Sequence, residues 1–256
     1  GSVSRYSEFG SRTNISAAHD RINGKVGLVE DYLAQNIGDA SNSAGGILSN
    51  ANDMANWMIT QLDSGRTPSA VELFKPASTN QLWKVIRPIP ISKVSEGLKP
   101  AQMDFFGYAL GFRAYNYQKY KVVGHGGKLG GFVSQLAMVP DLKLGITVLT
   151  NQESTSAYWS IIYHVLDYYE NNPEFDWLKA FSDEQVLAAA KLRESQNKNL
   201  IKPDPAGKYD LSIAKLAGKY KDEVYGDVML IPAGDGLLME FMKLPHLNAS
   251  LKYFQY

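Results

Sequence analysis

A single histidine beside a cluster of glycines is the feature of this 256-residue sequence most suited to chemistry. Residues 122–132 read VVGHGGKLGGF, so His125 ends an apolar run and glycines follow it. A histidine can move protons during acyl transfer, and glycines let backbone N–H groups approach a ligand closely enough to hold an oxyanion. The same residues also suit a tight hairpin with an incidental histidine, and composition alone does not separate the two interpretations.

Several other catalytic and cofactor patterns are missing from the sequence. It has no cysteine, which excludes a thiol nucleophile, a thiolate zinc site and an iron–sulfur cluster. The remaining histidines, His19, His164 and His246, lack the spacing of metal ligands. No Gly-x-Ser-x-Gly elbow follows His125, which excludes a lipase-type α/β-hydrolase, and neither glycine pattern of nucleotide-binding loops occurs. We therefore expect no metal and no cofactor.

The charge balance bears on the partners of the protein. The chain has 26 basic and 26 acidic side chains and no basic tract, so we expect no nucleic-acid partner. No stretch approaches the roughly 18–20 consecutive apolar residues of a transmembrane helix, so we expect no membrane span.

The elements that would position His125 are predicted from residue patterns. Ser49 or Asn50 can cap a helix that ends near Gly65, and repeated prolines in 67–103 predict short helices and loops. Strands are predicted at 108–115, 120–124, 132–139 and 144–150, with short connections typical of antiparallel neighbours. A helix at 156–169 would cover them. The expected fold class is α/β (α+β), an antiparallel sheet flanked by helices.

Three tyrosines are interpreted as an exposed aromatic face of a strand, with the lining of a substrate cleft as the alternative: Tyr115, Tyr117 and Tyr120.

The rest of the chain predicts loop or extended structure at 4–43, packed on a larger element, and a helix that opens with a capping box at Ser182 and runs to about Lys198. A linker is expected at 202–205, and short strands at 218–220, 228–231, 237–241 and 251–256. About 40 residues cannot easily close a barrel or sandwich. The expected domains are a large first portion (1–172), a helix and linker (173–215) and the start of a small β-rich accessory unit (216–256).

Five blocks together carry a resemblance to a known family: AGGILS with NDMANW (44–57), YALGF (108–112), HGG (125–127), GGF (130–132) and GITVLTN (145–151). In this order and spacing they resemble the β-lactamase-related serine hydrolases, which include class C β-lactamases, DD-peptidases and related esterases. The resemblance implies a β-lactamase/transpeptidase-like fold and an acyl-enzyme mechanism, in which a serine attacks a carbonyl and two backbone N–H groups hold the oxyanion.

The resemblance also implies roles for the glycine-rich stretch. His125-Gly126-Gly127 matches the family's third motif, which lies on an edge strand beside the nucleophile. His125 would face the cleft, the backbone N–H of Lys128 would be one oxyanion donor, and Gly127 would keep side chains away from the substrate. Gly126, Gly130 and Gly131 would contribute to substrate binding. A histidine in place of a permanent cation weakens carboxylate recognition at neutral pH, which favours peptides or esters over penicillins.

The sequence departs from the family at the nucleophile. Ser-x-x-Lys and Tyr-x-Asn both precede the AGG block in the family, and neither lies before it here. Matches at 195–198, 212–215 and 169–171 are interpreted as chance, because they are short patterns that follow the histidine motif. We therefore expect the C-terminal portion of a longer hydrolase, inactive by itself.

Partners and location are expected only through the resemblance. The acyl substrate would be a small molecule or a peptide, and the parent protein would be periplasmic or secreted. Exposed apolar surface would favour self-association or a complementary N-terminal chain. The alternative is a non-catalytic module of the penicillin-binding kind that binds a peptide, a glycan or a partner chain.

Overall fold

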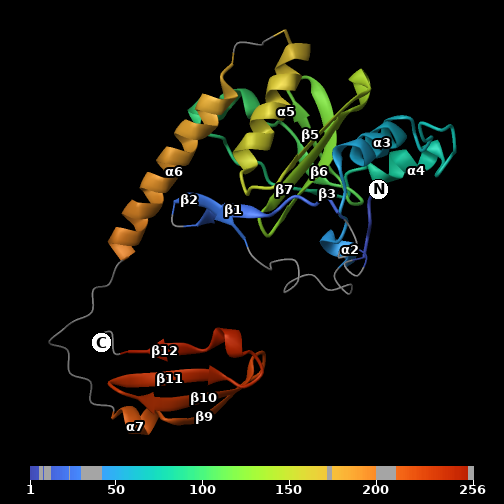
Figure 1. Ribbon diagram of the computed structural model, residues 1–256. Coiled ribbons are helices and arrows are strands. Elements are labelled where there is room, and N and C mark those ends of the chain that lie inside the picture. Colours follow the sequence, from blue (N-terminus) through green and yellow to red (C-terminus); the bar gives the residue numbers. More distant parts are fainter. Residues whose placement is uncertain are drawn as a thin grey trace. The chain divides into compact units, whose positions relative to one another are not determined.

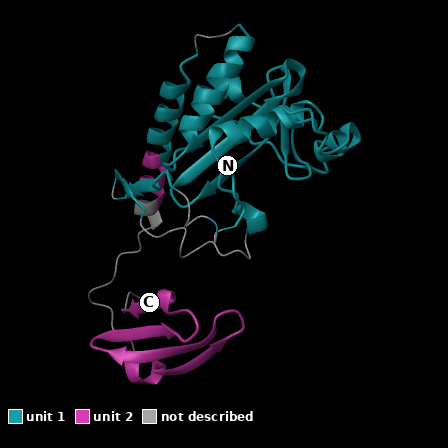
Figure 2. Ribbon diagram, turned by 45° about the vertical axis from the view of Figure 1, so that its right-hand side comes forward, with its two compact units in different colours: residues 1–188 teal, residues 189–256 magenta. Residues whose placement is uncertain are grey.

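The chain forms two compact units in the computed structural model, residues 1–188 and residues 189–256 (Figure 2). The structure describes residues 1–5, 8, 13–22, 24–29, 42–171, 175–199 and 212–252. The linker predicted at 202–205 and the end of the last predicted strand, 253–256, lie outside these residues. The domain boundaries expected from the sequence remain predictions.

A six-stranded antiparallel sheet forms the centre of the first unit (Figure 1). Its strands follow one another in space as they do in the sequence, which the short connections predict. They are β3 (Arg87–Pro88), β4 (Phe106–Tyr108), β5 (Arg113–Tyr117), β6 (Tyr120–Leu129), β7 (Phe132–Val139) and β8 (Leu144–Thr150). The predicted fold class, an antiparallel sheet flanked by helices, is confirmed.

The single strand predicted at 108–115 is wrong, because the chain turns inside it. Gly111 has a φ of +77°, and the N–H of Ala109 donates to the carbonyl of Phe112 at 2.7 Å. This tight turn separates β4 from β5 and pairs Tyr108 with Arg113. The next strand pair continues the register, with Arg113 opposite Gly124.

Helices cover both faces of the sheet (Figure 1). On one face lie α3 (Ala51–Leu62) and α4 (Pro76–Leu82), and on the other lies α5 (Thr155–Tyr169), against which the first residues of α6 (Trp177–Asn199) pack. A Cβ on Gly145 of β8 would come within 2.9 Å of Met58 Sδ, so this glycine lets α3 approach the sheet. The helix predicted to be capped by Ser49 or Asn50 is confirmed, and Asn50 is the cap, since its Oδ1 accepts from the N–H of Asp53 at 3.0 Å. The shorter elements include α2 (Asn42–Gly45) and the 3₁₀ turns η3 (Glu96–Ala101) and η4 (Pro140–Leu142).

The helix predicted to open at Ser182 begins instead at Trp177. Asp176 Oδ1 accepts from the N–H of Lys179 at 2.9 Å, so Asp176 is the effective cap. The earlier start places Trp177, which is buried, in the core beneath α5.

An aromatic core fills the space between the sheet and α5. Tyr115 and Tyr117 are buried there, so both interpretations of the strand tyrosines are wrong for these two residues. Tyr117 stacks on Tyr163 with ring centroids 4.9 Å apart. Its hydroxyl donates to the buried carboxylate of Asp167, which also accepts from Trp177 Nε1 at 2.5 Å. Burial and this carboxylate raise the pKa of Tyr117 well above its ordinary value, so the phenol stays protonated and donates.

A hairpin occupies part of the segment predicted to be loop or extended structure. Strands β1 (His19–Ile22) and β2 (Lys25–Leu28) pair antiparallel beside Gly24, whose φ is +82°. The Asn-Gly dipeptide at 23–24 is the sequence signal for such a turn. His19 of β1 also bridges to Gln152, which brings this hairpin next to the end of β8.

The second unit is a four-stranded antiparallel sheet with strand order β12-β11-β10-β9. Its elements are α7 (Ile213–Leu216), β9 (Gly218–Asp222), β10 (Gly226–Ala233), β11 (Gly236–Phe241), η5 (Pro245–Leu247) and β12 (Ala249–Leu251). A tight turn joins β10 to β11, with Ala233 paired to Gly236 and Gly234 at a φ of +61°. The sheet is open rather than a closed barrel in the described residues.

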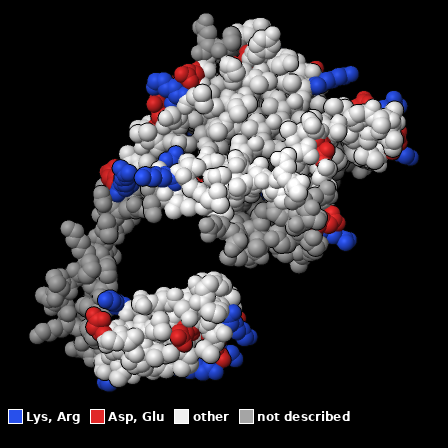
Figure 3. All heavy atoms as spheres, in the orientation of Figure 1, with Lys and Arg blue, Asp and Glu red and all other residues white. Residues whose placement is uncertain are grey.

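Charged side chains are dispersed over the surface shown in Figure 3, with basic and acidic groups interspersed and wide areas carrying neither. No helix within the described ranges is both long enough and apolar enough to cross a membrane.

Candidate active site

Strand β6 carries the predicted site residues and is longer than expected. It continues through the glycines to Leu129 instead of ending at Gly124, because β7 pairs with it as far as Leu129 opposite Phe132. Successive side chains of a strand point to opposite faces, so His125 and Val123 share the face that packs toward α3. The motif does not lie on an edge strand here, since β6 stands between β5 and β7.

One side of the C-terminal half of β6 is nevertheless open. Pairing with β5 ends at Arg113 opposite Gly124, and no other strand of the described chain pairs with β6 on that side. The two-residue hairpin loops at 118–119 and 130–131 fix which N–H groups point to which neighbour. By this alternation the N–H groups of Gly126 and Lys128 point to the open side. The backbone donor expected at Lys128 therefore lies where a ligand strand or an oxyanion can reach it.

His125 is held at both ring nitrogens. Nδ1 lies 2.7 Å from the carbonyl oxygen of Gly126, and Nε2 lies 3.0 Å from the hydroxyl of Tyr108 on β4. The two rings meet edge to face, with centroids 5.7 Å apart. Tyr108 belongs to the YALGF block, but the sequence alone does not show that its hydroxyl meets His125.

A cavity of about 480 Å³ opens beside His125. Its other walls are mostly apolar and come from α3, α4, the β4–β5 turn and β7: Met54, Trp57, Gln61, Phe74, Leu82, Leu110, Gly111, Phe112 and Leu136. Gln61 is fully buried, and neither its Nε2 nor its Oε1 has a hydrogen-bond partner among the described residues. A pocket of this size and lining suits an apolar group next to a few polar contacts.

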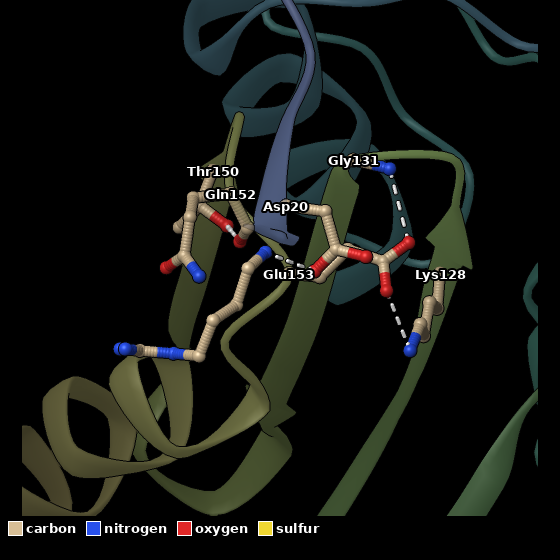
Figure 4. Close-up of polar contacts among 7 residues, drawn as sticks. Asp20, Lys128, Gly131, Thr150, Gln152 and Glu153 are labelled. Atoms are coloured by element: carbon tan, nitrogen blue, oxygen red, sulfur yellow. Dashed lines mark hydrogen bonds and ion pairs between the residues drawn. The ribbon is translucent and has the colours of Figure 1, made fainter. Parts of the chain in front are cut away.

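The turn after the motif is held by a carboxylate (Figure 4). Glu153 accepts from the N–H of Gly131 at 3.0 Å and from Lys128 Nζ at 2.6 Å, and its side chain is only 11% exposed. Burial raises the pKa of Glu153, but the Gly131 N–H and the Lys128 ammonium outweigh burial and hold this pKa below its ordinary value. Glu153 in turn raises the pKa of Lys128. This Glu153 clamp was not predicted from the sequence.

The structure thus places the predicted residues in two groups. His125, Gly126, Gly127 and Lys128 follow one another along the open end of β6. Gly130 and Gly131 form the β6–β7 turn, where the carbonyl of Gly131 accepts from the N–H of His19 at 3.4 Å. A Cβ on Gly131 would lie 2.7 Å from Ala18 Cβ, so this glycine permits close packing of the N-terminal hairpin.

The sequence matches interpreted as chance lie elsewhere. Ser195 is on α6 and Ser212 precedes α7, and both belong to the second compact unit, whereas His125 belongs to the first. Tyr169 ends α5, on the sheet face opposite α3. Within the described residues, no group of three or more histidine, aspartate or glutamate side chains could hold a metal ion.

Comparison with known proteins assigns the family. The family model described as β-lactamase matches residues 8–165, which is more than half of the chain. The chain belongs to the β-lactamase family. This confirms the resemblance carried by the five sequence blocks and the predicted β-lactamase-like fold.

The curated relatives of this β-lactamase-family chain are hydrolases. The unguisins hydrolases ungD′ of Aspergillus campestris and ungD of Aspergillus violaceofuscus are each 26% identical to it, over 73% and 76% of the chain. These alignments cover 34% and 36% of the relatives, so the chain spans about a third of their length. A solved structure of SurE aligns with 94% of this chain and 52% of its own, at 15% identity and a TM-score of 0.38. That likeness is too weak to carry an argument.

Proposed function

We propose that this chain is part of a serine hydrolase that forms an acyl-enzyme on an amide or ester, with a peptide or ester favoured over a penicillin. The single observation that carries the proposal is the open end of β6. There His125 with its Tyr108 partner, the glycine pair and the outward N–H of Lys128 lie together beside an apolar cavity. Such a strand can bind an extended acyl substrate and donate to the oxyanion.

The nucleophile belongs, in this proposal, to a segment outside these 256 residues. Neither Ser195 nor Ser212 lies in the unit that holds His125. The family membership and the hydrolase names of the two relatives support a hydrolase, while the acyl-enzyme, the location of the serine and the substrate class are inferred.

Intact-mass analysis after treatment with a fluorophosphonate, which labels activated serines, tests this proposal. We expect the 256-residue chain to keep its mass and the longer protein that contains it to gain a single adduct. The longer protein should also release product from a p-nitrophenyl ester or an aminoacyl p-nitroanilide. A single adduct on the 256-residue chain that disappears in Ser212→Ala would overturn the location of the nucleophile. A longer protein without label or turnover would favour the non-catalytic binding module.

A further inference from the structure

The contacts of His125 determine which of its nitrogens carries the proton. A carbonyl oxygen only accepts hydrogen bonds, so the 2.7 Å contact with the Gly126 carbonyl requires a proton on Nδ1. A neutral imidazole carries a single N–H, which leaves Nε2 as an acceptor. The hydroxyl of Tyr108, 3.0 Å from Nε2, is then the donor in that bond.

The strand register brings Tyr108 to the level of His125 but not to the same face of the sheet, because paired residues share a face and Tyr108 therefore lies on the face of Arg113 and Gly124. Tyr108 pairs with Arg113, and Arg113 pairs with Gly124, the residue just before His125. Since β5 separates β4 from β6 only as far as Arg113, the Tyr108 side chain reaches His125 past the start of β5. It therefore borders the open side of β6, to which the N–H groups of Gly126 and Lys128 point.

We propose that Tyr108 is a positioning residue of the site, fixing His125 in the Nδ1–H tautomer and placing its own hydroxyl oxygen at the open side of β6. In this arrangement neutral His125 has no N–H left for a substrate. Its single N–H, on Nδ1, donates to the Gly126 carbonyl, and the lone pair of Nε2 accepts from the Tyr108 hydroxyl. Beside the N–H groups of Gly126 and Lys128, the Tyr108 oxygen is then a side-chain polar atom available at the open side of β6. With its proton directed to Nε2, this oxygen accepts hydrogen bonds, so it suits an amide N–H or an ammonium group better than a carboxylate.

This inference rests on the proposed function in one respect: the ligand that contacts the Tyr108 oxygen is taken to be an acyl substrate. The tautomer itself is measured on the 256-residue chain, without turnover, by long-range ¹H–¹⁵N correlation of the imidazole at a pH where His125 is neutral. We expect a protonated Nδ1 and an unprotonated Nε2 whose signal is shifted by hydrogen bonding. In Tyr108→Phe, the Nε2 signal should move toward that of an unbonded imidazole nitrogen.

Tyr120→Phe is the matched control. Tyr120 is on β6 like His125, but it lies at the opposite end of the strand, where it pairs with Tyr117. It should leave the His125 signals unchanged. A wild-type ring protonated at Nε2, or an Nε2 signal that does not respond to Tyr108→Phe, would overturn the inference. Circular dichroism shows whether Tyr108→Phe stays folded; if it does not, the wild-type tautomer alone decides.

The positioning role is then tested in the longer protein. We expect Tyr108→Phe to lower kcat/KM about tenfold, which is the effect of losing about one hydrogen bond in the transition state. The loss should be larger for an amide substrate than for the matched ester, which lacks the N–H. Equal rates for wild type and Tyr108→Phe would contradict the role. Absence of turnover in both proteins would count against the hydrolase proposal and leave the tautomer result valid.

Discussion

Substitution of Gly127 tests whether this glycine is needed for substrate binding or for packing of the fold. It lies on the same face of β6 as His125, and a Cβ there would meet only Ser134 Oγ, at 3.3 Å. We expect Gly127→Ala to change the free energy of unfolding by less than about 1 kcal/mol. In the proposed longer protein, the added methyl group would stand where we propose that an extended substrate binds, so kcat/KM should fall at least about tenfold.

Gly124→Ala is the comparison, because its Cβ would lie 1.9 Å from the backbone oxygen of Leu136. Relief of that overlap requires β6 and β7 to separate, so we expect a loss of about 3 kcal/mol or more in urea unfolding. A Gly127→Ala protein as unstable as Gly124→Ala would show that Gly127 serves packing. A stable Gly127→Ala protein with wild-type kcat/KM would remove Gly127 from the site.

Gln61 is the buried polar residue whose removal should stabilise the protein. An unpaired buried amide group costs about 1–3 kcal/mol, and methionine has a similar length without polar hydrogens or strong acceptors. We expect Gln61→Met to raise the free energy of unfolding by about 1 kcal/mol or more. The neighbouring Thr60→Val should not, since Thr60 Oγ1 donates to the Asn56 carbonyl at 2.8 Å. Reduced stability in Gln61→Met would mean that the amide is paired in solution.

At the scale of elements, the Glu153 clamp ties the β6–β7 turn to the segment after β8 and predicts a pH-dependent stability. The pKa of Glu153 is lower in the folded chain than its ordinary value of about 4.3. The stabilisation is therefore complete above the ordinary value and disappears as the pH falls through the lower, folded value. We expect wild type to exceed Glu153→Gln in stability near pH 7, with the difference shrinking as the pH falls below the ordinary pKa of a glutamate.

Urea unfolding at several pH values measures this difference, and Glu96→Gln is its control. Glu96 pairs with Lys99 three residues away on a highly exposed surface, so that substitution should give little difference at any pH. A gap between wild type and Glu153→Gln that persists unchanged to acid pH would contradict the clamp as an ionic contact.

The junction of β5, α5 and α6 depends on one carboxylate. Asp167 accepts from Tyr117 and Trp177, and all three residues are buried. Asp167→Ala leaves two buried donors unpaired, so we expect a loss of about 3 kcal/mol or more in an unfolding curve followed by tryptophan fluorescence. Asp183→Ala removes an exposed ion pair with Lys179 and should cost less than about 1 kcal/mol. Comparable losses in the two variants would contradict the buried network.

Elements with strong local patterns were predictable, whereas contacts between distant segments were not. Runs of strand-forming residues between turn signals predicted β7 and β8, and a cap at Ser49 or Asn50 predicted α3. The end of β6 was missed because glycines disfavour a strand locally, while pairing with β7 decides the outcome here. The register of three strands brings Tyr108 to the level of His125, and Glu153 reaches Gly131 across 22 residues. No spacing in the sequence encodes such contacts.

At the scale of the whole molecule, the two hydrophobic clusters belong to the first unit, whereas the buried apolar side chains described in the second unit are Val228 and Leu237. The two hydrophobic clusters draw on residues between Met54 and Phe181, and none comes from 189–256. The described side chains of α6 from 189 to 195 are exposed. The first unit also exposes several large apolar side chains around α3, α4 and the β4–β5 turn, including Ile59, Leu73 and Leu110. Self-association or a complementary chain on that surface remains a proposal, which sedimentation velocity can test.

The same reasoning predicts where the chain can be divided. Residues 1–188 should fold alone, with a melting temperature within about 4 °C of the whole chain, because deletion of 189–256 removes no member of either cluster. A chain of residues 1–172, which ends at the domain boundary expected from the sequence, should not retain this stability. That truncation removes Trp177 and Phe181 from the aromatic core and leaves Asp167 without one of its two donors. Calorimetry and near-ultraviolet circular dichroism of the two truncations measure the difference. A cooperative transition in 1–172 that matches the one in 1–188 would show that α6 contributes little to the core, and would place the domain boundary before that helix.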